Sequence, residues 1–96
     1  MERTLVIPNK AGLHMRAANL FVEVAGRFAA NVFVSRGEVR VNGKSIMGLM
    51  MLAAACGTSV RIEVAGDDEE AAMTALEQLV TGGFGEELAE TPEDAG

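Results

Sequence analysis

Alternation between apolar and polar positions predicts four short β-strands. We expect them over residues 2–8, 31–35, 38–41 and 58–65. The last run is the clearest, because Val60, Ile62 and Val64 share one face while polar residues occupy the other. The second and third runs flank Arg36-Gly37, which predicts a tight hairpin. The pattern therefore indicates a sheet with one buried face.

Apolar residues spaced by three and four positions predict three helices. We expect them over residues 15–28, about 45–55 and 67–81. Ser45 is expected to cap the second helix, and Gly57 to end it in a left-handed conformation. Asp67 is expected to begin the third helix in a capping box with Glu70, and Gly82-Gly83 to end it.

The order of these elements is β-α-β-β-α-β-α, which favours an α+β fold: a four-stranded antiparallel sheet covered on one face by three helices. We expect these elements to form a single domain over residues 1–85. Residues 86–96 (EELAETPEDAG) are acidic, and we expect them to form a flexible tail.

Composition excludes several classes of protein. The chain has 96 residues, of which 49% are hydrophobic, as expected for one small globular domain. The longest apolar run, 46–56, spans 11 residues, whereas a membrane-spanning helix needs about 20. No signal-peptide pattern is present, and the single cysteine, Cys56, excludes an internal disulfide. We therefore expect a cytoplasmic protein without membrane insertion, while the role of Cys56 stays open.

The net charge of −6 hides an asymmetry along the chain. Residues 67–96 carry ten acids and no base, which leaves residues 1–66 with a charge of +4. A mildly cationic first part suits an anionic ligand or an acidic partner, although acids crowding a C-terminal helix explain the asymmetry equally well. The charge is too weak for nucleic-acid binding, and the chain has no Trp or Tyr for base stacking.

His14 is the only histidine and directly precedes the first predicted helix. The free amides and the dipole of a helix N-terminus favour an anion there. An imidazole nitrogen can attack a phosphoryl group, and the guanidinium of Arg16 matches phosphate oxygens. From spacing alone, a simple capping or surface histidine is the favoured interpretation. One histidine without paired ligands predicts no metal site.

Lys44-Ser45-Ile46-Met47-Gly48 begins the second predicted helix. A phosphate on Ser45 would meet the helix dipole favourably, although a helix cap is a sufficient role for this serine. The helix is too apolar for one buried stripe. We expect Met47 and Met50 to be exposed, while Leu49 and Leu52 could lie on either side.

Two segments resemble those of a known family. Residues 11–18 (AGLHMRAA) resemble the active-site segment of HPr, the histidine-containing phosphocarrier of the bacterial phosphotransferase system. Residues 41–48 (VNGKSIMG) resemble that family's regulatory serine segment, with matching spacing between the two motifs. The resemblance covers residues 2–87 and implies the family's open-faced β-sandwich.

The resemblance implies a relay rather than a stand-alone enzyme. His14 would accept a phosphoryl group on Nδ1 from phosphorylated enzyme I and pass it to a histidine of a IIA domain, with Arg16 attending the phosphate and the backbone of Met15 and Ala17 supporting it. Ser45 would be phosphorylated by an HPr kinase/phosphorylase. The docking surface for partners would comprise Met47, Gly48, Met50 and Met51. The implied protein is a monomer that needs no cofactor.

Some residues depart from the family pattern. Met15 and Ala17 stand where the family usually has a small residue and a proline, and Ala11 stands where many members have a polar residue. Ala17 is a good helix former, so we expect the helix to survive. The alternative function is an HPr-like regulatory module that acts through phosphorylation of Ser45 and protein docking, with little transfer through His14. The sequence does not identify a sugar.

Overall fold

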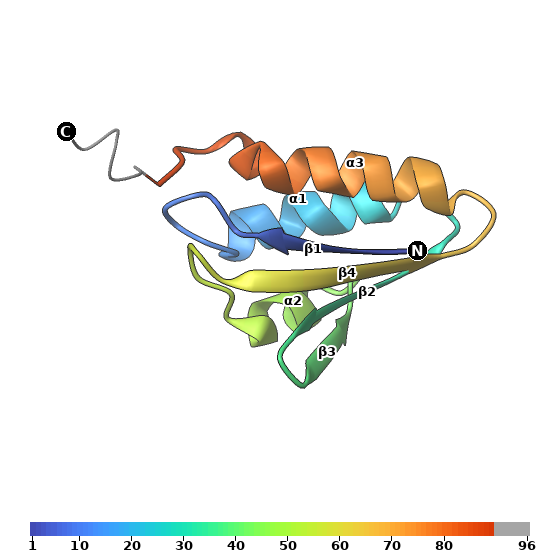
Figure 1. Cartoon of the computed structure of the whole chain (residues 1–96), viewed down its shortest axis with the longest axis horizontal. Helices are drawn as coiled ribbons and strands as arrows, with labels where there is room; N and C mark the ends of the chain where they lie inside the picture. The colour runs from blue at the N-terminus through green and yellow to red at the C-terminus, as the bar shows by residue number, and fades with distance from the viewer. Residues whose placement is uncertain (90–96) are drawn as a thin grey trace.

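The computed structural model describes residues 1–89 and contains one four-stranded antiparallel sheet. Its strands lie in the order β1-β4-β2-β3 (Figure 1). Their bounds are β1 Glu2–Val6, β2 Asn31–Arg36, β3 Val39–Asn42 and β4 Ser59–Ala65. The hairpin loop is Gly37-Glu38, because Arg36 pairs with Val39. The hairpin prediction is confirmed, with its turn one residue later than expected.

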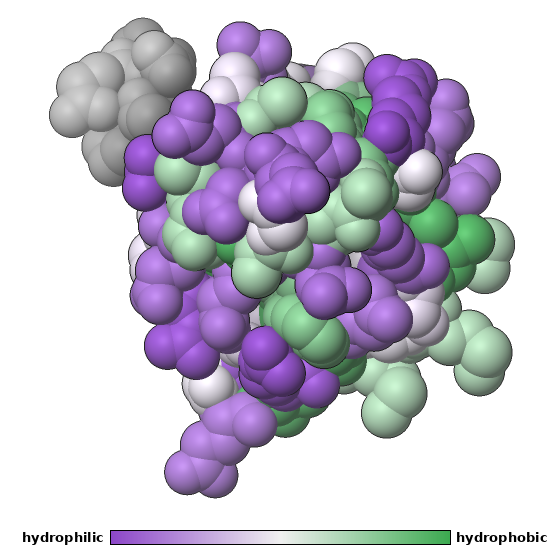
Figure 2. All heavy atoms as spheres, turned by 90° about the vertical axis from the view of Figure 1, so that its right-hand side faces the viewer, coloured by the Kyte–Doolittle hydropathy of each residue, from purple (hydrophilic) through white to green (hydrophobic). Residues whose placement is uncertain are grey.

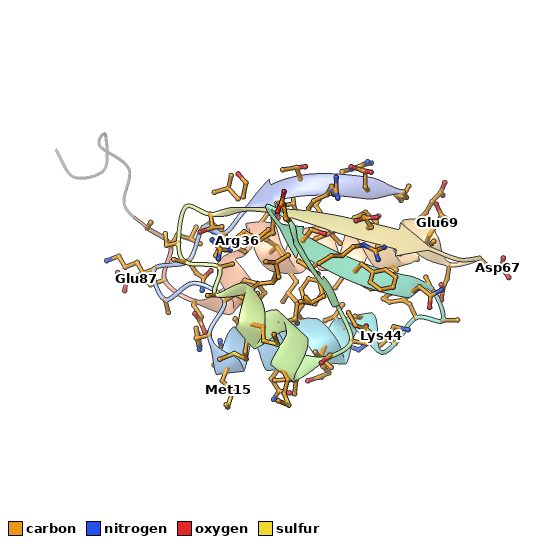
Figure 3. The ribbon with its side chains drawn as sticks, turned by 90° about the horizontal axis from the view of Figure 1, so that it is seen from below. Met15, Arg36, Lys44, Asp67, Glu69 and Glu87 are labelled. Atoms are coloured by element: carbon orange, nitrogen blue, oxygen red, sulfur yellow. The ribbon has the colours of Figure 1, made fainter. Side chains whose placement is uncertain are left out.

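Three α-helices and one short 3-10 helix accompany the sheet. Their bounds are α1 Met15–Ala25, α2 Ile46–Leu52, α3 Glu69–Thr81 and η1 Gly83–Gly85. Figure 3 shows α1 and α2 on the same side of the sheet, away from its open face. The predicted α+β class and the open sheet with three helices are therefore confirmed. No helix in residues 1–89 is long and apolar enough to cross a membrane.

The core lies between the sheet and the helices. Val32, Val34 and Ile62 point inward from the two central strands, as the alternating pattern predicted. The helices bury apolar residues against them, including Ala18, Phe21, Leu49, Leu52, Met73 and Leu76. The structure thus settles that Leu49 and Leu52 belong to the core. The open face carries polar residues and the stacked pair of Arg40 and Phe33, 3.8 Å from guanidinium carbon to ring centre.

The predicted end of the second helix was wrong. α2 ends at Leu52 because Ala53 takes a left-handed conformation, with φ of 51°. The carbonyls on either side of Ala53 bond outside the helix. That of Leu52 accepts from Arg36 Nε, and that of Ala54 accepts from the amide of Leu13. Gly57 does have a positive φ, but it lies in the turn that leads to β4.

The predicted capping box of α3 was also wrong. The helix begins at Glu69, and the Asp68 side chain makes no bond to the helix amides. Its carboxylate instead accepts from the amides of Ala29 and Ala30, at 2.8 and 2.9 Å. The Asp68 carboxylate therefore bonds to the turn before β2 instead of to the first amides of α3.

Residues 86–89 lie against the domain. The amide of Lys10 donates to the Glu87 carbonyl at 3.0 Å, and the amide of Ala89 donates to the Pro8 carbonyl at 2.8 Å. Asn9 and Leu88 form an isolated antiparallel bridge. The first part of the segment expected to be a tail is thus hydrogen-bonded to the N-terminal loop, and residues 90–96 lie outside the described residues.

Candidate functional site

His14 is the N-cap residue of α1. Its backbone is extended, with φ of −84° and ψ of −177°, and its carbonyl accepts the first helical hydrogen bond from Ala18. Its ring nitrogen Nδ1 accepts from the amide of Arg16 at 3.2 Å. A nitrogen that accepts a hydrogen bond carries no proton, so Nδ1 presents its lone pair at the helix N-terminus.

The other ring nitrogen faces a carboxylate. Nε2 of His14 lies 2.7 Å from Oε2 of Glu86, and the same oxygen accepts from Nη1 of Arg16 at 2.7 Å. Arg16 also reaches the carbonyl of Phe84 at 3.3 Å. Two predicted site residues, His14 and Arg16, are therefore brought together by a third that the sequence did not indicate.

A buried asparagine anchors this carboxylate. The amide nitrogen Nδ2 of Asn9 donates to Oε1 of Glu86 at 2.9 Å and to the carbonyl of Gly12 at 2.8 Å. Asn9 is completely buried, and its Oδ1 has no hydrogen-bond partner among residues 1–89. Asn9 therefore ties Glu86 to the loop that carries His14.

A left-handed turn delivers Glu86 to the site. Gly83, Phe84 and Gly85 have φ values of 67°, 57° and 73°, and Phe84 is buried although its conformation is unusual for a residue with a side chain. A Cβ on Gly83 would lie 2.2 Å from Cδ2 of Leu88. The turn follows α3 directly and brings the next residue, Glu86, into contact with His14.

The surroundings of Glu86 favour its charged form. Partial desolvation raises the pKa of Glu86, but hydrogen bonds from Asn9, Arg16 and His14 outweigh that effect, and the pKa lies below its ordinary value. The side chain of Glu86 is 18% exposed and that of His14 is 35% exposed. The site therefore contains a persistent carboxylate beside a solvent-accessible imidazole.

The loop before His14 is docked on the exit of α2. The amide of Leu13 donates to the Ala54 carbonyl at 2.8 Å. Gly12 has φ of +71°, and a Cβ there would lie 2.8 Å from the same carbonyl oxygen. This close backbone approach requires glycine at position 12 and fixes the position of His14, two residues later.

The second predicted motif forms the start of α2. Ser45 is its N-cap residue, and its Oγ accepts from the amide of Gly48 at 3.0 Å. Lys44 is held by the turn that follows α1, since its Nζ donates to the Phe28 carbonyl at 2.7 Å. Ser45 is thus a capping residue in this structure, and the residue is half-buried.

The methionines of α2 face solvent. Met47 and Met51 are 78% and 73% exposed, and Met50 is 38% exposed. Met15, on α1, points away from the sheet (Figure 3) and is also exposed. Ala17 is completely buried in the first turn of α1. Figure 2, which views the right-hand end of Figure 1, shows a largely hydrophilic face with hydrophobic side chains along its lower right edge.

Other features of residues 1–89 carry no comparable chemistry. No group of three or more His, Cys, Asp or Glu side chains in this range could hold a metal ion. A hollow on the open face of the sheet is lined in part by Phe33, Arg40 and Glu63, and it includes none of the predicted site residues. Cys56 is a free, half-buried thiol near the Pro8 carbonyl.

Sequence reasoning missed Asn9 and Glu86. Asn9 lies just beyond the first predicted strand, and Glu86 lies in the predicted tail. The cluster of glycines around Phe84 does signal an irregular turn. Nothing in the local sequence indicates which loop that turn faces.

Comparison with known proteins gives consistent results. A family model described as the phosphorylation site of the PTS HPr component matches residues 1–82. The phosphocarrier protein HPr of Neisseria meningitidis serogroup A is 52% identical over 86 residues, which cover 90% of this chain and 97% of that protein. HPr-C-His of Thermoanaerobacter tengcongensis has a TM-score of 0.88 at 46% identity, covering 92% of this chain and 99% of that one. Crh of Bacillus subtilis, a swapped dimer, has a TM-score of 0.71 at 44% identity, covering 77% and 85%.

Proposed function

The chain belongs to the HPr family of phosphocarrier proteins, and we propose that it carries a phosphoryl group on Nδ1 of His14. The observation that supports this most strongly is the hydrogen bond from the Arg16 amide to Nδ1. It leaves that nitrogen unprotonated and aimed at the N-terminus of α1, where an anion is stabilised by backbone amides.

The transfer proceeds by nucleophilic substitution at phosphorus. The lone pair of Nδ1 is released from the Arg16 amide and forms the new N–P bond, while the bond from phosphorus to the donor's nitrogen breaks and its electron pair stays with the donor. The oxygens of the bound phosphoryl group then face the first-turn amides of Met15, Arg16 and Ala17. Passing the group to an acceptor reverses the same step. The site requires no cofactor or metal for it.

The proposed donor is phosphorylated enzyme I, and the proposed acceptor is a histidine of a IIA domain. Partners dock on the surface of Met47, Gly48, Met50 and Met51, where the methionines are exposed and Gly48 is half-buried, because flexible thioethers adapt to more than one partner. The His14 site is assembled within one chain, so we propose that the monomer is active in the cytoplasm.

Ser45 is proposed as a regulatory phosphorylation site for an HPr kinase/phosphorylase. A phosphate at this N-cap would add close to two negative charges beside the docking methionines, roughly −1.5 to −2 at neutral pH. The alternative function, a regulatory module that acts chiefly through Ser45, finds support in the similarity to Crh, whose published description concerns catabolite repression.

The deciding experiment follows the intact mass of the protein after incubation with enzyme I and phosphoenolpyruvate. We expect the gain of one phosphate that is lost in acid, and no gain in His14→Ala, which should keep its fold because His14 contributes little to the core. Labelling that persists in His14→Ala would refute the assignment. An acid-stable phosphate that appears only with ATP and a kinase would favour the regulatory module.

A further inference from the structure

We propose that Glu86 is a positioning residue for His14: it keeps the ring proton on Nε2, so that Nδ1 is the nucleophile, and it stabilises the charge that the ring gains during transfer. This inference rests on the proposed function of His14. Glu86 lies beyond the residues 1–82 that the family model matches, and its role comes from the contacts in this chain.

The hydrogen-bond pattern defines a single tautomer. A carboxylate oxygen can only accept, so the 2.7 Å contact between Glu86 and His14 places the ring proton on Nε2. The Arg16 amide can only donate, so its contact with Nδ1 keeps that nitrogen unprotonated. Both contacts favour the tautomer with its proton on Nε2, as in hydrolases where a buried carboxylate orients a histidine.

The carboxylate also balances charge during the step. When Nδ1 bonds to phosphorus while Nε2 keeps its proton, the imidazole ring becomes positively charged. Glu86 lies directly against that proton, and a fixed opposite charge stabilises the charge as it develops. On transfer to the acceptor, the N–P bond breaks, its electrons return to Nδ1, and the proton has remained on Nε2 throughout.

Two neighbours keep Glu86 in this position. Asn9 donates to its second oxygen from a fully buried site, and Arg16 donates to the oxygen that faces His14. Arg16 also offsets the negative charge that Glu86 would otherwise direct at an incoming phosphoryl group. Glu87 has no such contacts: its side chain is exposed and pairs with Lys10 at 3.1 Å. It therefore provides a matched control.

The tautomer can be measured without any partner. Because the chain has one histidine, 15N labelling of histidine gives only two ring-nitrogen signals. In alkaline buffer we expect a protonated Nε2 and an unprotonated Nδ1 in the wild type and in Glu87→Gln. In Glu86→Ala the two signals should move toward each other as the second tautomer becomes populated. Identical signals in Glu86→Ala and the wild type would overturn the tautomer part of the proposal.

The charge effect is measured as the rate of phosphoryl uptake from phosphorylated enzyme I. Glu86→Gln retains an oxygen that accepts from Nε2 but loses the charge, so we expect the wild-type tautomer. We expect uptake to slow about 10- to 100-fold, by analogy with the partners that orient metal-bound histidines. Glu87→Gln should react at the wild-type rate. Equal rates in Glu86→Gln and the wild type would overturn the charge part. Failure of the wild type to be phosphorylated would refute the proposed function instead, and the tautomer result would still stand.

Discussion

Replacement of Gly12 by alanine tests how the fold holds the functional histidine. Gly12 has φ of +71°, and a Cβ there would lie 2.8 Å from the Ala54 carbonyl oxygen and 3.0 Å from Cα of Ala55. Both atoms belong to the backbone, so neither can move as a flexible side chain would. The alanine must shift the loop away from the end of α2, and His14 must move with it.

The magnitude follows from two separate costs. A left-handed conformation costs a residue with a side chain roughly 1–2 kcal/mol, and an overpacked contact adds about 1–3 kcal/mol. Gly37 has φ of +59° with nothing within 4 Å of its Cβ position, so Gly37→Ala meets only the first cost. Both substitutions reduce the entropy of the unfolded chain alike, and that effect cancels. Gly12→Ala should therefore be about 1–3 kcal/mol less stable than Gly37→Ala.

The assay combines urea unfolding with the rate of phosphoryl uptake. We expect Gly12→Ala to lose both stability and uptake rate, and Gly37→Ala to lose stability alone, because Gly37 lies in the β2–β3 hairpin. Equal stability of the two variants would refute the close-approach argument. A Gly12→Ala protein that is destabilised yet phosphorylated at the wild-type rate would refute the coupling between this loop and His14.

Three further predictions follow from the contacts. Ser45→Asp should slow phosphorylation of His14 by adding charge beside the docking methionines, and an unchanged rate measured by intact mass would argue against regulation through Ser45. Asn9→Ala should lower the free energy of unfolding in urea by about 1–3 kcal/mol, since the carbonyl of Gly12 loses its partner. Hydrogen bonds from the Ala29 and Ala30 amides, the former the largest effect, lower the pKa of Asp68 below 3.8 against a smaller opposing effect of desolvation. Asp68 therefore adds stability above pH 3.8 that is lost as the pH falls below that value; urea unfolding should show a smaller acid loss in Asp68→Asn and no such change in Asp67→Asn.

The local pattern of apolar and polar residues was sufficient to predict the elements that bury one face against the core. The alternation around Val60, Ile62 and Val64 identified β4, because a strand with one buried face repeats every two residues. Helix ends were less predictable. α2 ends at Leu52, before Ala53, a residue with no local tendency to a left-handed conformation, because the carbonyls of Leu52 and Ala54 bond to Arg36 and to the loop before His14.

Within the His14 site, too, residues close in sequence were predictable and a residue distant in sequence was not. His14 and Arg16 lie two positions apart on one helix terminus, so sequence spacing alone placed them together. Glu86 is 72 positions from His14, and only the left-handed turn around Phe84 brings the two side chains into contact. Asp68 shows the same effect at the opposite end of the molecule, where Figure 3 places Asp67 far from Glu87. Long-range hydrogen bonds of charged side chains are not encoded in local pattern.

Coupling between 31P and 15N in the phosphorylated, histidine-labelled protein shows directly whether the phosphoryl group is carried on Nδ1 of His14. We expect phosphorus to couple directly to Nδ1, with the proton remaining on Nε2 beside Glu86. A phosphorus bonded to Nε2, or a phosphate that shows no coupling to the single histidine, would contradict it.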